Sequence, residues 1–163
     1  MATHRYCPLC ARELVETPVE GLLRRTCSDI ACGYVFWDNP LPVVAGIVEY
    51  DGTVLLARNQ AWPEGTFGLI TGFVERGEDP RDAVAREIRE EVDLQAEQIT
   101  LVGAYGFPRK NELIIAYHVV ASGTIRLNHE LAELKPVPIP ELQGWSSATG
   151  LAVTDWLRSR QSR

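Results

Sequence analysis

The chain has 163 residues, of which 45% are hydrophobic and 23% charged, and its formal net charge is −6. This composition is typical of a globular protein, and the length allows one ordinary domain with at most a very small second module. The acidic balance argues against a general nucleic-acid binder, which needs Lys and Arg to replace phosphate counterions. No apolar run approaches the roughly 20 residues that span a bilayer, and the N-terminus lacks an apolar signal segment, so we expect a cytoplasmic protein without a membrane partner.

All four cysteines lie near the N-terminus, as the close pairs Cys7/Cys10 and Cys27/Cys32. In a cytoplasmic protein two such pairs indicate a metal site before they indicate disulfides. Four thiolates satisfy tetrahedral Zn²⁺ and leave no open position, so this zinc would be structural. We therefore predict a small zinc ribbon over residues 1–38, with folding energy supplied largely by the metal. Two disulfides, or four unrelated buried thiols, are the alternatives.

Residues 39–163 are predicted to form one further domain, which begins at a proline-containing segment. The apolar runs 43–49 and 53–57 fit two strands, and Asp51-Gly52 between them is typical of a hairpin turn. Further elements are expected at 67–74 (a strand turning into a loop), 99–105 and 113–121 (strands) and 151–158 (a short helix).

A helix is predicted from Pro80 to about Val92, with Asp79 as its N-cap and the proline at its first position. Val84, Ile88 and Val92 recur every four residues and form its buried stripe. The strands and helices do not alternate regularly. The sequence therefore predicts an α/β protein with a mixed sheet rather than a doubly wound nucleotide-binding fold.

Three acids of this helix, Glu87, Glu90 and Glu91, fall on one face, and Glu91 lies at the edge of the buried stripe. Most charge runs are solvated faces. Here, however, like charges at this spacing cost ~0.2–0.5 kcal/mol per pair, and acids near a helix C-terminus oppose its dipole. A bound cation would offset both penalties, while Arg86 can pair with Glu90 one turn later.

A carboxylate cluster of this kind suits pyrophosphate hydrolysis, which needs an activated water and neutralisation of charge on the phosphoryl oxygens. Mg²⁺ or Mn²⁺ prefers oxygen ligands and keeps several waters, so a few glutamates and the substrate phosphates suffice to bind it. Gly72 and Gly77 would let the preceding loop pass close to such a site.

The segment from Gly72 to Leu94 resembles the Nudix box. The residues in register with that pattern are Gly72, Glu78, Arg86, Glu87, Ile88, Glu90, Glu91 and Leu94. One position departs from it, because Asp93 replaces the glycine that ends the helix in a left-handed conformation. Asp tolerates that conformation better than most residues, so we expect a modest loss of stability and little effect on catalysis.

The resemblance implies a Nudix α/β/α sandwich with a mixed sheet, preceded by the small ribbon. It also implies that Glu87 and Glu91 are Mg²⁺ or Mn²⁺ ligands and that Glu90 is a further ligand or the base. Arg86 would then orient these acids, and Glu78 would help to hold the loop.

A later acid often completes the metal site in this family. Glu130 is our candidate for that position, Glu133 is its rival, and a simple surface acid is the alternative to both.

A zinc ribbon ahead of a Nudix domain resembles the NADH pyrophosphatase branch. The stretch 104–112 keeps only Phe107 and Pro108 of the signature that follows the box in that branch, so ADP-ribose or FAD is at least as consistent a substrate as NADH. Phe73 and Phe107 are candidates to stack on a base or flavin, with core packing as the alternative. Trp62, Trp145 and Trp156 are scattered in the sequence and are expected in the core or at its rim.

The resemblance thus implies a metal-dependent hydrolase of a nucleoside diphosphate linked to another group (NADH or NAD, ADP-ribose, FAD), which releases a nucleoside monophosphate. Zinc-bearing relatives suggest a homodimer. The alternative is a non-catalytic Nudix-fold sensor whose ribbon contacts nucleic acid or protein, although such sensors usually lose the metal-binding acids. Decapping of NAD-capped RNA would need a basic path for the strand, and the acidic balance disfavours it despite Arg24-Arg25 and Arg109-Lys110.

Overall fold

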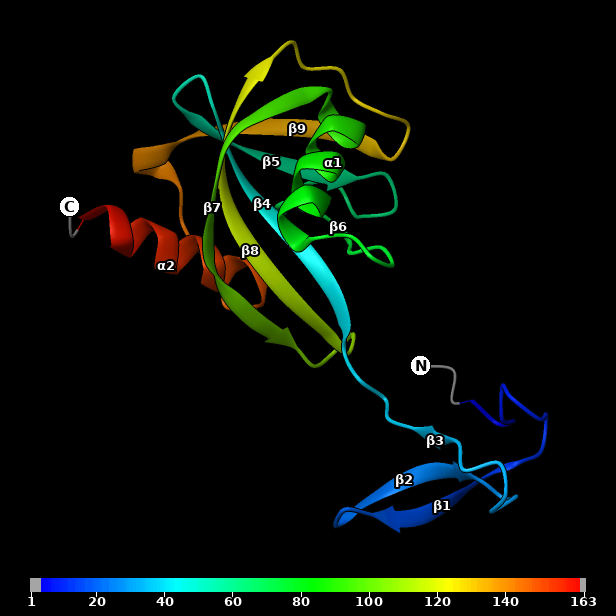
Figure 1. Cartoon of the computed structure of the whole chain (residues 1–163). Helices are drawn as coiled ribbons and strands as arrows, with labels where there is room; N and C mark the ends of the chain where they lie inside the picture. The colour runs from blue at the N-terminus through cyan, green and yellow to red at the C-terminus, as the bar shows by residue number, and fades with distance from the viewer. Residues whose placement is uncertain (1–3, 162–163) are drawn as a thin grey trace. The chain divides into compact units, whose positions relative to one another are not determined.

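A computed structural model describes residues 4–161 of the chain. The protein folds as two compact units, Met1–Asn39 and Pro40–Arg163, and Figure 1 traces both. The division lies next to the boundary expected after residue 38. Over the described residues, no helix is both long and apolar enough to cross a membrane.

The N-terminal unit contains a three-stranded antiparallel sheet in the order β1-β2-β3, formed by Leu14–Val19, Leu22–Cys27 and Val35–Phe36. Its buried core consists of Cys7, Leu14 and Cys27, against which Cys32, Tyr34 and Phe36 pack. Half of these six side chains are cysteines, so the apolar core of this unit is very small.

The second unit is built on a six-stranded sheet with the strand order β7-β8-β4-β5-β9, in which β6 also pairs with β4. The strands are β4 (Leu41–Tyr50), β5 (Thr53–Asn59), β6 (Ile70–Phe73), β7 (Leu94–Phe107), β8 (Glu112–Gly123) and β9 (Leu131–Pro138). β4 and β8 are parallel, whereas every other pair is antiparallel. The predicted mixed sheet is therefore confirmed.

Two helices cover opposite faces of this sheet, α1 (Pro80–Val92) and α2 (Thr149–Gln161), as Figure 1 shows. Side chains of β4 alternate between the two faces, as expected for a strand. Val44 packs with Ile88 of α1 in one hydrophobic cluster, whereas Ile47 packs in the cluster that contains Trp156 of α2. The layers are helix, sheet and helix, which confirms the predicted α/β/α sandwich. A short 3₁₀ helix, Ile139–Glu141, precedes α2.

Local signals in the sequence fix several element boundaries. The Asp79 side chain accepts a hydrogen bond from the backbone N–H of Arg81, and α1 ends at Asp93 in the left-handed conformation, with φ of 59°. Asp51 and Gly52 both have positive φ, 46° and 75°, in the two-residue turn between β4 and β5. The predicted cap, helix end and hairpin are thus confirmed.

Three elements differ from the sequence-based expectation. β7 begins at Leu94, directly after α1, rather than near residue 99, and α2 is longer than the expected 151–158. β9 was not predicted, and it contains Pro136 and Pro138, which argue against a strand. Within the described residues β9 pairs only with β5, and the edge of a sheet is where proline is tolerated.

Candidate active site and zinc centre

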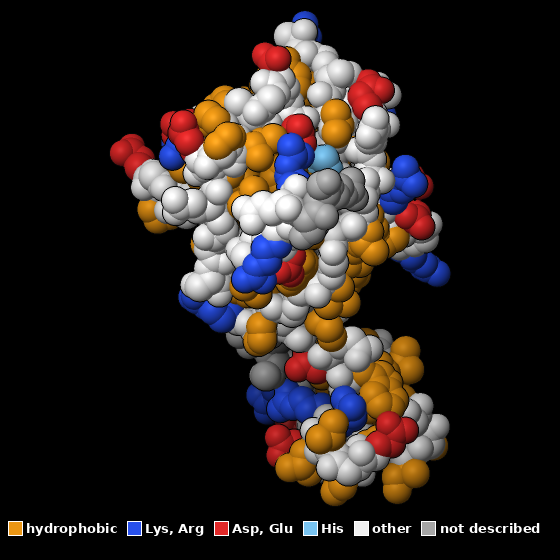
Figure 2. All heavy atoms as spheres, turned by 90° about the vertical axis from the view of Figure 1, so that its left-hand side faces the viewer, with side chains coloured by type: hydrophobic (Ala, Val, Ile, Leu, Met, Phe, Trp, Pro, Cys, Tyr) orange, Lys and Arg blue, Asp and Glu red, His pale blue; other side chains and the backbone are white. Residues whose placement is uncertain are grey.

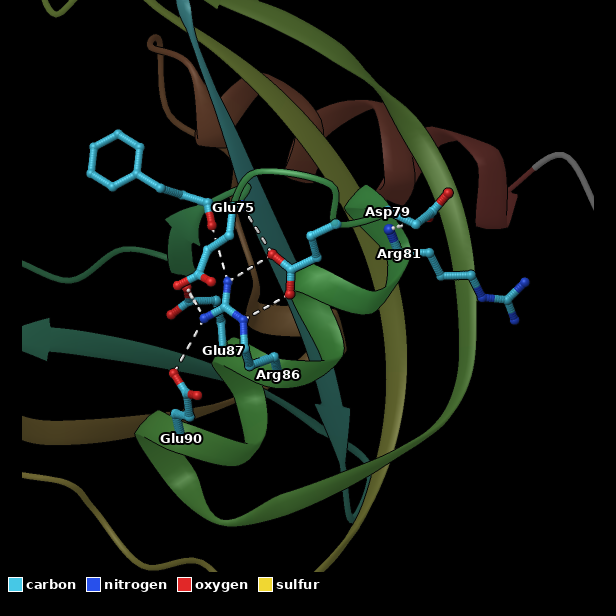
Figure 3. A network of polar contacts seen from close by, with 8 residues as sticks. Glu75, Asp79, Arg81, Arg86, Glu87 and Glu90 are labelled. Carbon is cyan, nitrogen blue, oxygen red and sulfur yellow. Dashed lines mark hydrogen bonds and ion pairs between the residues drawn. The ribbon is translucent and has the colours of Figure 1, made fainter.

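Arg86 on α1 is the centre of a hydrogen-bonded network (Figure 3). Its Nε and Nη2 donate to the two carboxylate oxygens of Glu78 at 2.8 and 3.0 Å, and Nη2 also donates to the carbonyl oxygen of Phe73 at 3.0 Å. Its Nη1 donates to Glu87 at 2.7 Å and to Glu90 at 3.2 Å. One guanidinium therefore ties the loop before α1 to two acids of the helix, and the predicted pairing with Glu90 is confirmed.

Glu78 holds the loop as well as the arginine. Its carboxylate accepts a hydrogen bond from the backbone N–H of Glu75 at 3.0 Å. The bond from Arg86, together with this backbone bond, lowers the pKa of Glu78 to about 2. This carboxyl is therefore ionised at any physiological pH, and the bidentate pair persists.

Gly72 on β6 lies directly beneath the carboxylate of Glu87. A Cβ atom built at Gly72 would come within 1.8 Å of the Glu87 Cδ atom, so any side chain here would displace that acid. Gly77 has φ of +81°, a conformation that glycine adopts at little cost. The structure therefore explains why both positions are glycine. At Gly72 the reason concerns the site directly, because the Glu87 carboxylate occupies the space of a side chain.

Glu91 is the buried acid of the cluster, with a side chain that is only 7% exposed. Its burial, together with the nearby charge of Glu87, raises its pKa to about 8. Burial likewise raises the pKa of Glu87. Ionising the buried Glu91 carboxylate next to other acids costs free energy, and a bound cation would lower that cost. The predicted position of Glu91 beside the buried stripe is confirmed.

These acids line a cavity of about 370 Å³, whose charged lining residues are Glu87, Glu90, Glu91, Lys110, Glu112 and Glu130. Glu130 reaches it from the segment before β9, where its backbone N–H donates to the Asn128 side chain at 2.9 Å. Glu133 instead pairs with Arg58 at 3.3 Å and is half exposed. The structure therefore brings Glu130, and not its rival Glu133, to the α1 acids.

Two charged residues of this cavity, Lys110 and Glu112, were not singled out as site residues from the sequence. For Lys110 the sequence left two interpretations, a contact with a phosphate and a solvated turn, of which the turn was preferred, and Glu112 carries no local signal. Both lie where β7 returns into β8, and Glu112 is paired with Leu41 across the parallel β4–β8 ladder. The pairing of β8 with β4 holds this turn where Lys110 and Glu112 line the same cavity as the α1 acids.

The two candidate stacking residues lie in different places. Phe73 lines the acidic cavity, and its side chain is 55% exposed, so core packing does not account for it. Phe107 is partly buried against the cluster on the α2 face and also lines a second cavity of about 550 Å³. Packing and substrate contact are therefore compatible for Phe107.

The four cysteines of the N-terminal unit converge in one cluster, with all Sγ atoms within 4.8 Å of one another. The Sγ atoms of Cys7 and Cys32 are 3.7 Å apart, those of Cys10 and Cys27 are 3.4 Å apart, and all four thiols are free. Ligands at the Zn–S distance of ~2.3 Å around a tetrahedral ion lie about 3.8 Å apart. This sulfur cluster fits Zn²⁺ and is not arranged as two disulfides.

Comparison with known proteins gives a consistent family. The NUDIX domain model matches residues 40–157. A protein described as NAD-capped RNA hydrolase NudC from Mycobacterium bovis is 33% identical over 127 residues, which is 75% of this chain and 39% of that protein. The chain spans less than half the length of the curated relatives that it matches, 42% and 39% for two of them.

Solved structures show the same fold. A NUDIX hydrolase from Nitrosomonas europaea superposes with a TM-score of 0.79 at 22% identity, covering 98% of this chain and 93% of that one. The NUDIX domain of Shewanella oneidensis NrtR, solved in complex with ADP ribose, gives a TM-score of 0.60 at 17% identity over 75% of this chain and 88% of that one.

Proposed function

The chain belongs to the Nudix family, and from that premise we propose that it is a metal-dependent pyrophosphohydrolase. It cleaves the pyrophosphate of a nucleoside diphosphate linked to a second group and releases a nucleoside monophosphate. One observation carries this proposal. Glu87, Glu90, Glu91 and Glu130 meet around a single cavity in which Glu91 is buried and its pKa is raised to about 8.

The acids of the cavity have the chemistry of a Mg²⁺ or Mn²⁺ site. Glu87, Glu91 and Glu130 would hold the cation, since hard divalent ions prefer carboxylate oxygens. When bound, it neutralises charge on the phosphoryl oxygens and activates the attacking water. Glu90 is more exposed and is held by Arg86 at 3.2 Å, so it remains available as a further ligand or as the base that accepts the proton of that water.

The other residues of the site position these groups. Arg86 and Glu78 fix the loop and the carboxylates before substrate arrives, which lowers the entropy cost of assembling the site. Gly72 lets the backbone of β6 approach Glu87 closely. Lys110 lies on the cavity wall and offers a positive charge to a phosphate that the acids by themselves would repel.

The relatives and the charge of the chain support this substrate class. The relative named above acts on NAD-capped RNA and the neighbour structure holds ADP ribose, and both ligands contain a nucleoside diphosphate. On the face shown in Figure 2, basic and acidic side chains are interspersed over the main unit. The formal net charge of −6 disfavours a long RNA strand, so a small nucleotide of the NAD, ADP-ribose or FAD class suits the protein better.

Two properties of the whole protein are part of the proposal. We infer a cytoplasmic location, because thiolates that bind zinc persist in a reducing compartment. We also propose a homodimer, which rests on the resemblance to zinc-bearing relatives. Light scattering in solution would measure the mass, and a monomer would contradict this part.

Product analysis tests the proposed activity. The full-length protein is incubated with Mg²⁺ or Mn²⁺ and NADH, NAD⁺, ADP-ribose, FAD or a dinucleoside polyphosphate, and we expect AMP from at least one. Glu91→Gln should lower kcat/KM by roughly 100- to 1,000-fold without loss of thermal stability. Glu97→Gln, at a polar contact with Ser122 on β7 and β8, is the matched control. No turnover but tight binding of one compound would indicate the sensor instead.

A further inference from the structure

The loop between β8 and β9, residues 124–130, closes the C-terminal end of α1. The last four carbonyl groups of a helix have no partner within the helix itself. Here the backbone N–H of Arg126 donates to the carbonyl oxygen of Val92 at 3.0 Å, and that of Asn128 donates to the carbonyl oxygen of Glu91 at 3.0 Å. The loop is therefore fixed to the end of the helix that carries the buried acid.

The side chain of Asn128 holds the next part of the same loop. Its Oδ1 atom accepts a hydrogen bond from the backbone N–H of Glu130 at 2.9 Å and a second from that of Leu131 at 3.2 Å. Asparagine commonly fixes a tight turn by bonding to the backbone two residues on. The carbonyl oxygen of Glu130 in turn accepts a hydrogen bond from the backbone N–H of Gln60 at 2.8 Å. Glu130 is thus held at both of its backbone polar groups.

Asn128 connects two acids of the proposed metal site that lie far apart in the sequence. Its backbone N–H binds the carbonyl group of Glu91, and its side chain binds the N–H group of Glu130. Both acids line the cavity of about 370 Å³, whereas Asn128 is not among the residues that line it. Movement of this one residue would therefore change the separation of the two carboxylates without any direct contact between Asn128 and a ligand in the cavity.

The two carboxylates repel each other when no cation lies between them. Burial and the charge of Glu87, followed by the charge of Glu130, raise the pKa of Glu91 to about 8. Glu130 is an exposed residue, so side-chain packing does little to oppose movement of its carboxylate away from the other acids. The backbone hydrogen bonds to Asn128 and Gln60 do oppose that movement.

We propose that Asn128 is a positioning residue of the metal site, which holds Glu130 beside Glu91 before the cation binds. Ligands that are already in place bind a metal more tightly, because the loop does not have to be ordered at the moment of binding. This inference rests on the proposed function for the presence of the cation, and it adds the residue that sets the geometry of two of its ligands.

Binding of Mn²⁺ to the full-length protein without substrate tests this role. Asn128→Ala should weaken Mn²⁺ binding, measured by electron paramagnetic resonance of the free ion, by roughly 10-fold, the lower end of the range for residues that orient a metal ligand. Asn128→Ser should recover part of the loss, because a serine hydroxyl can accept the bond from the N–H two residues on. Arg126→Gln is the matched control in the same loop. It removes only an exposed ion pair with Asp93 at 3.9 Å and should leave Mn²⁺ binding unchanged.

A double-mutant cycle separates positioning from a general loss of stability. If Asn128 acts through the carboxylate of Glu130, then Asn128→Ala should change the Mn²⁺ affinity of a Glu130→Gln protein by less than about 2-fold. An unchanged Mn²⁺ affinity in folded Asn128→Ala would overturn the inference. An equal loss of affinity with and without the Glu130 carboxylate would overturn it as well.

A measurement on the unaltered protein covers the case in which Asn128→Ala does not fold. In protein without added Mg²⁺, the backbone amides of Asn128 and Glu130 should exchange slowly with solvent, because both are hydrogen-bonded before a cation arrives. Hydrogen exchange followed by NMR measures them individually. Protection of these two amides only after Mg²⁺ is added would mean that the cation, and not Asn128, places Glu130.

The two proposals fail in different ways. Mn²⁺ binding that depends on Asn128 as expected, without hydrolysis of any nucleotide, would remove the proposed activity and keep the positioning role. Hydrolysis in the wild type, together with equal Mn²⁺ affinity in the wild type and in folded Asn128→Ala, would keep the hydrolase and remove the positioning role.

Discussion

In the N-terminal unit two of the four candidate zinc ligands are part of the core, whereas in the second unit Glu87 and Glu91 lie on a helix that has an apolar core of its own. Cys7 and Cys27 are two of the three buried core side chains in the part of the ribbon that the structure describes. Glu87 and Glu91, in contrast, lie on α1, whose stripe of Val84 and Ile88 is buried against the sheet.

This difference predicts that the two proposed metals are coupled to the fold in two different ways. Where ligands form the core, metal affinity is folding free energy, and the apo unit has little to hold it together. Where the ligands lie on a helix with its own apolar core, the cost of gathering the acids appears locally, as the raised pKa of Glu91. Metal loss should therefore unfold the first unit and only inactivate the second.

The strongest test of this contrast is removal of the zinc. Structural zinc contributes apparent binding free energies of about 10–16 kcal/mol at neutral pH in small zinc domains. A zinc chelator, or Cys27→Ser, should therefore abolish the protection of amide hydrogens in β1 and β2 while β4 and β8 keep theirs, as measured by hydrogen exchange. Ser28→Ala serves as the control. Undiminished protection of β1 and β2 after metal removal would refute a structural zinc.

A comparison of Glu130 with Glu133, near the start of β9, tests which acid belongs to the proposed metal site of the second unit. Glu130→Gln should lower kcat/KM by roughly 10- to 100-fold, the range seen when a group that supports a metal is lost, and should raise the Mg²⁺ concentration for half-maximal activity. Glu133→Gln should change neither kcat/KM nor this Mg²⁺ concentration by much. Its exposed ion pair with Arg58 contributes at most ~1 kcal/mol to stability and lies outside the cavity. Steady-state kinetics across Mg²⁺ concentrations measure both. Equal effects of the two changes would contradict the placement of Glu130.

The ion pair between Glu78 and Arg86 should make the stability of the second unit depend on pH. The pKa of Glu78 is about 2 in the folded protein and near 4.5 in an unfolded chain. Its contribution to stability is therefore fully present above pH 4.5 and is lost as the pH falls toward 2. Wild-type protein should exceed Glu78→Gln in Tm by a few degrees at pH 6. The gap should close in scans between pH 4.5 and 2, and a gap independent of pH would contradict this.

The smallest expected effect is a change in stability caused by a substitution at the C-terminal end of α1. Asp93 occupies the left-handed region at φ of 59°, where a side chain is unfavourable. Asp93→Gly should therefore stabilise the second unit by up to ~1 kcal/mol, seen as a higher urea midpoint with unchanged activity. Asp82→Gly, within the first turn of the same helix, should instead destabilise it by about 0.5–1 kcal/mol. A lower midpoint for Asp93→Gly would mean that the aspartate stabilises this turn.

Sequence patterns predicted those parts of the site that lie on one continuous element. The spacing of Glu87, Glu90 and Glu91 places them on one helical face because the period of the helix is fixed. The same reasoning placed Glu91 beside the core and paired Arg86 with Glu90. It did not locate Glu112, which depends on the pairing of β4 with β8 and not on its neighbours in the chain.

The sequence by itself determined the capped helix with its acids, the hairpin at Asp51-Gly52 and the clustered cysteines, since each depends on local backbone preferences or short spacings. Only the tertiary structure decided that β9 forms despite its prolines, that Glu130 and not Glu133 reaches the acids, and that Trp62 and Trp145 line one cavity. The physical reason is that strand order and loop closure bring distant segments together. Those arrangements are selected by packing over the whole sheet rather than by any short stretch of residues.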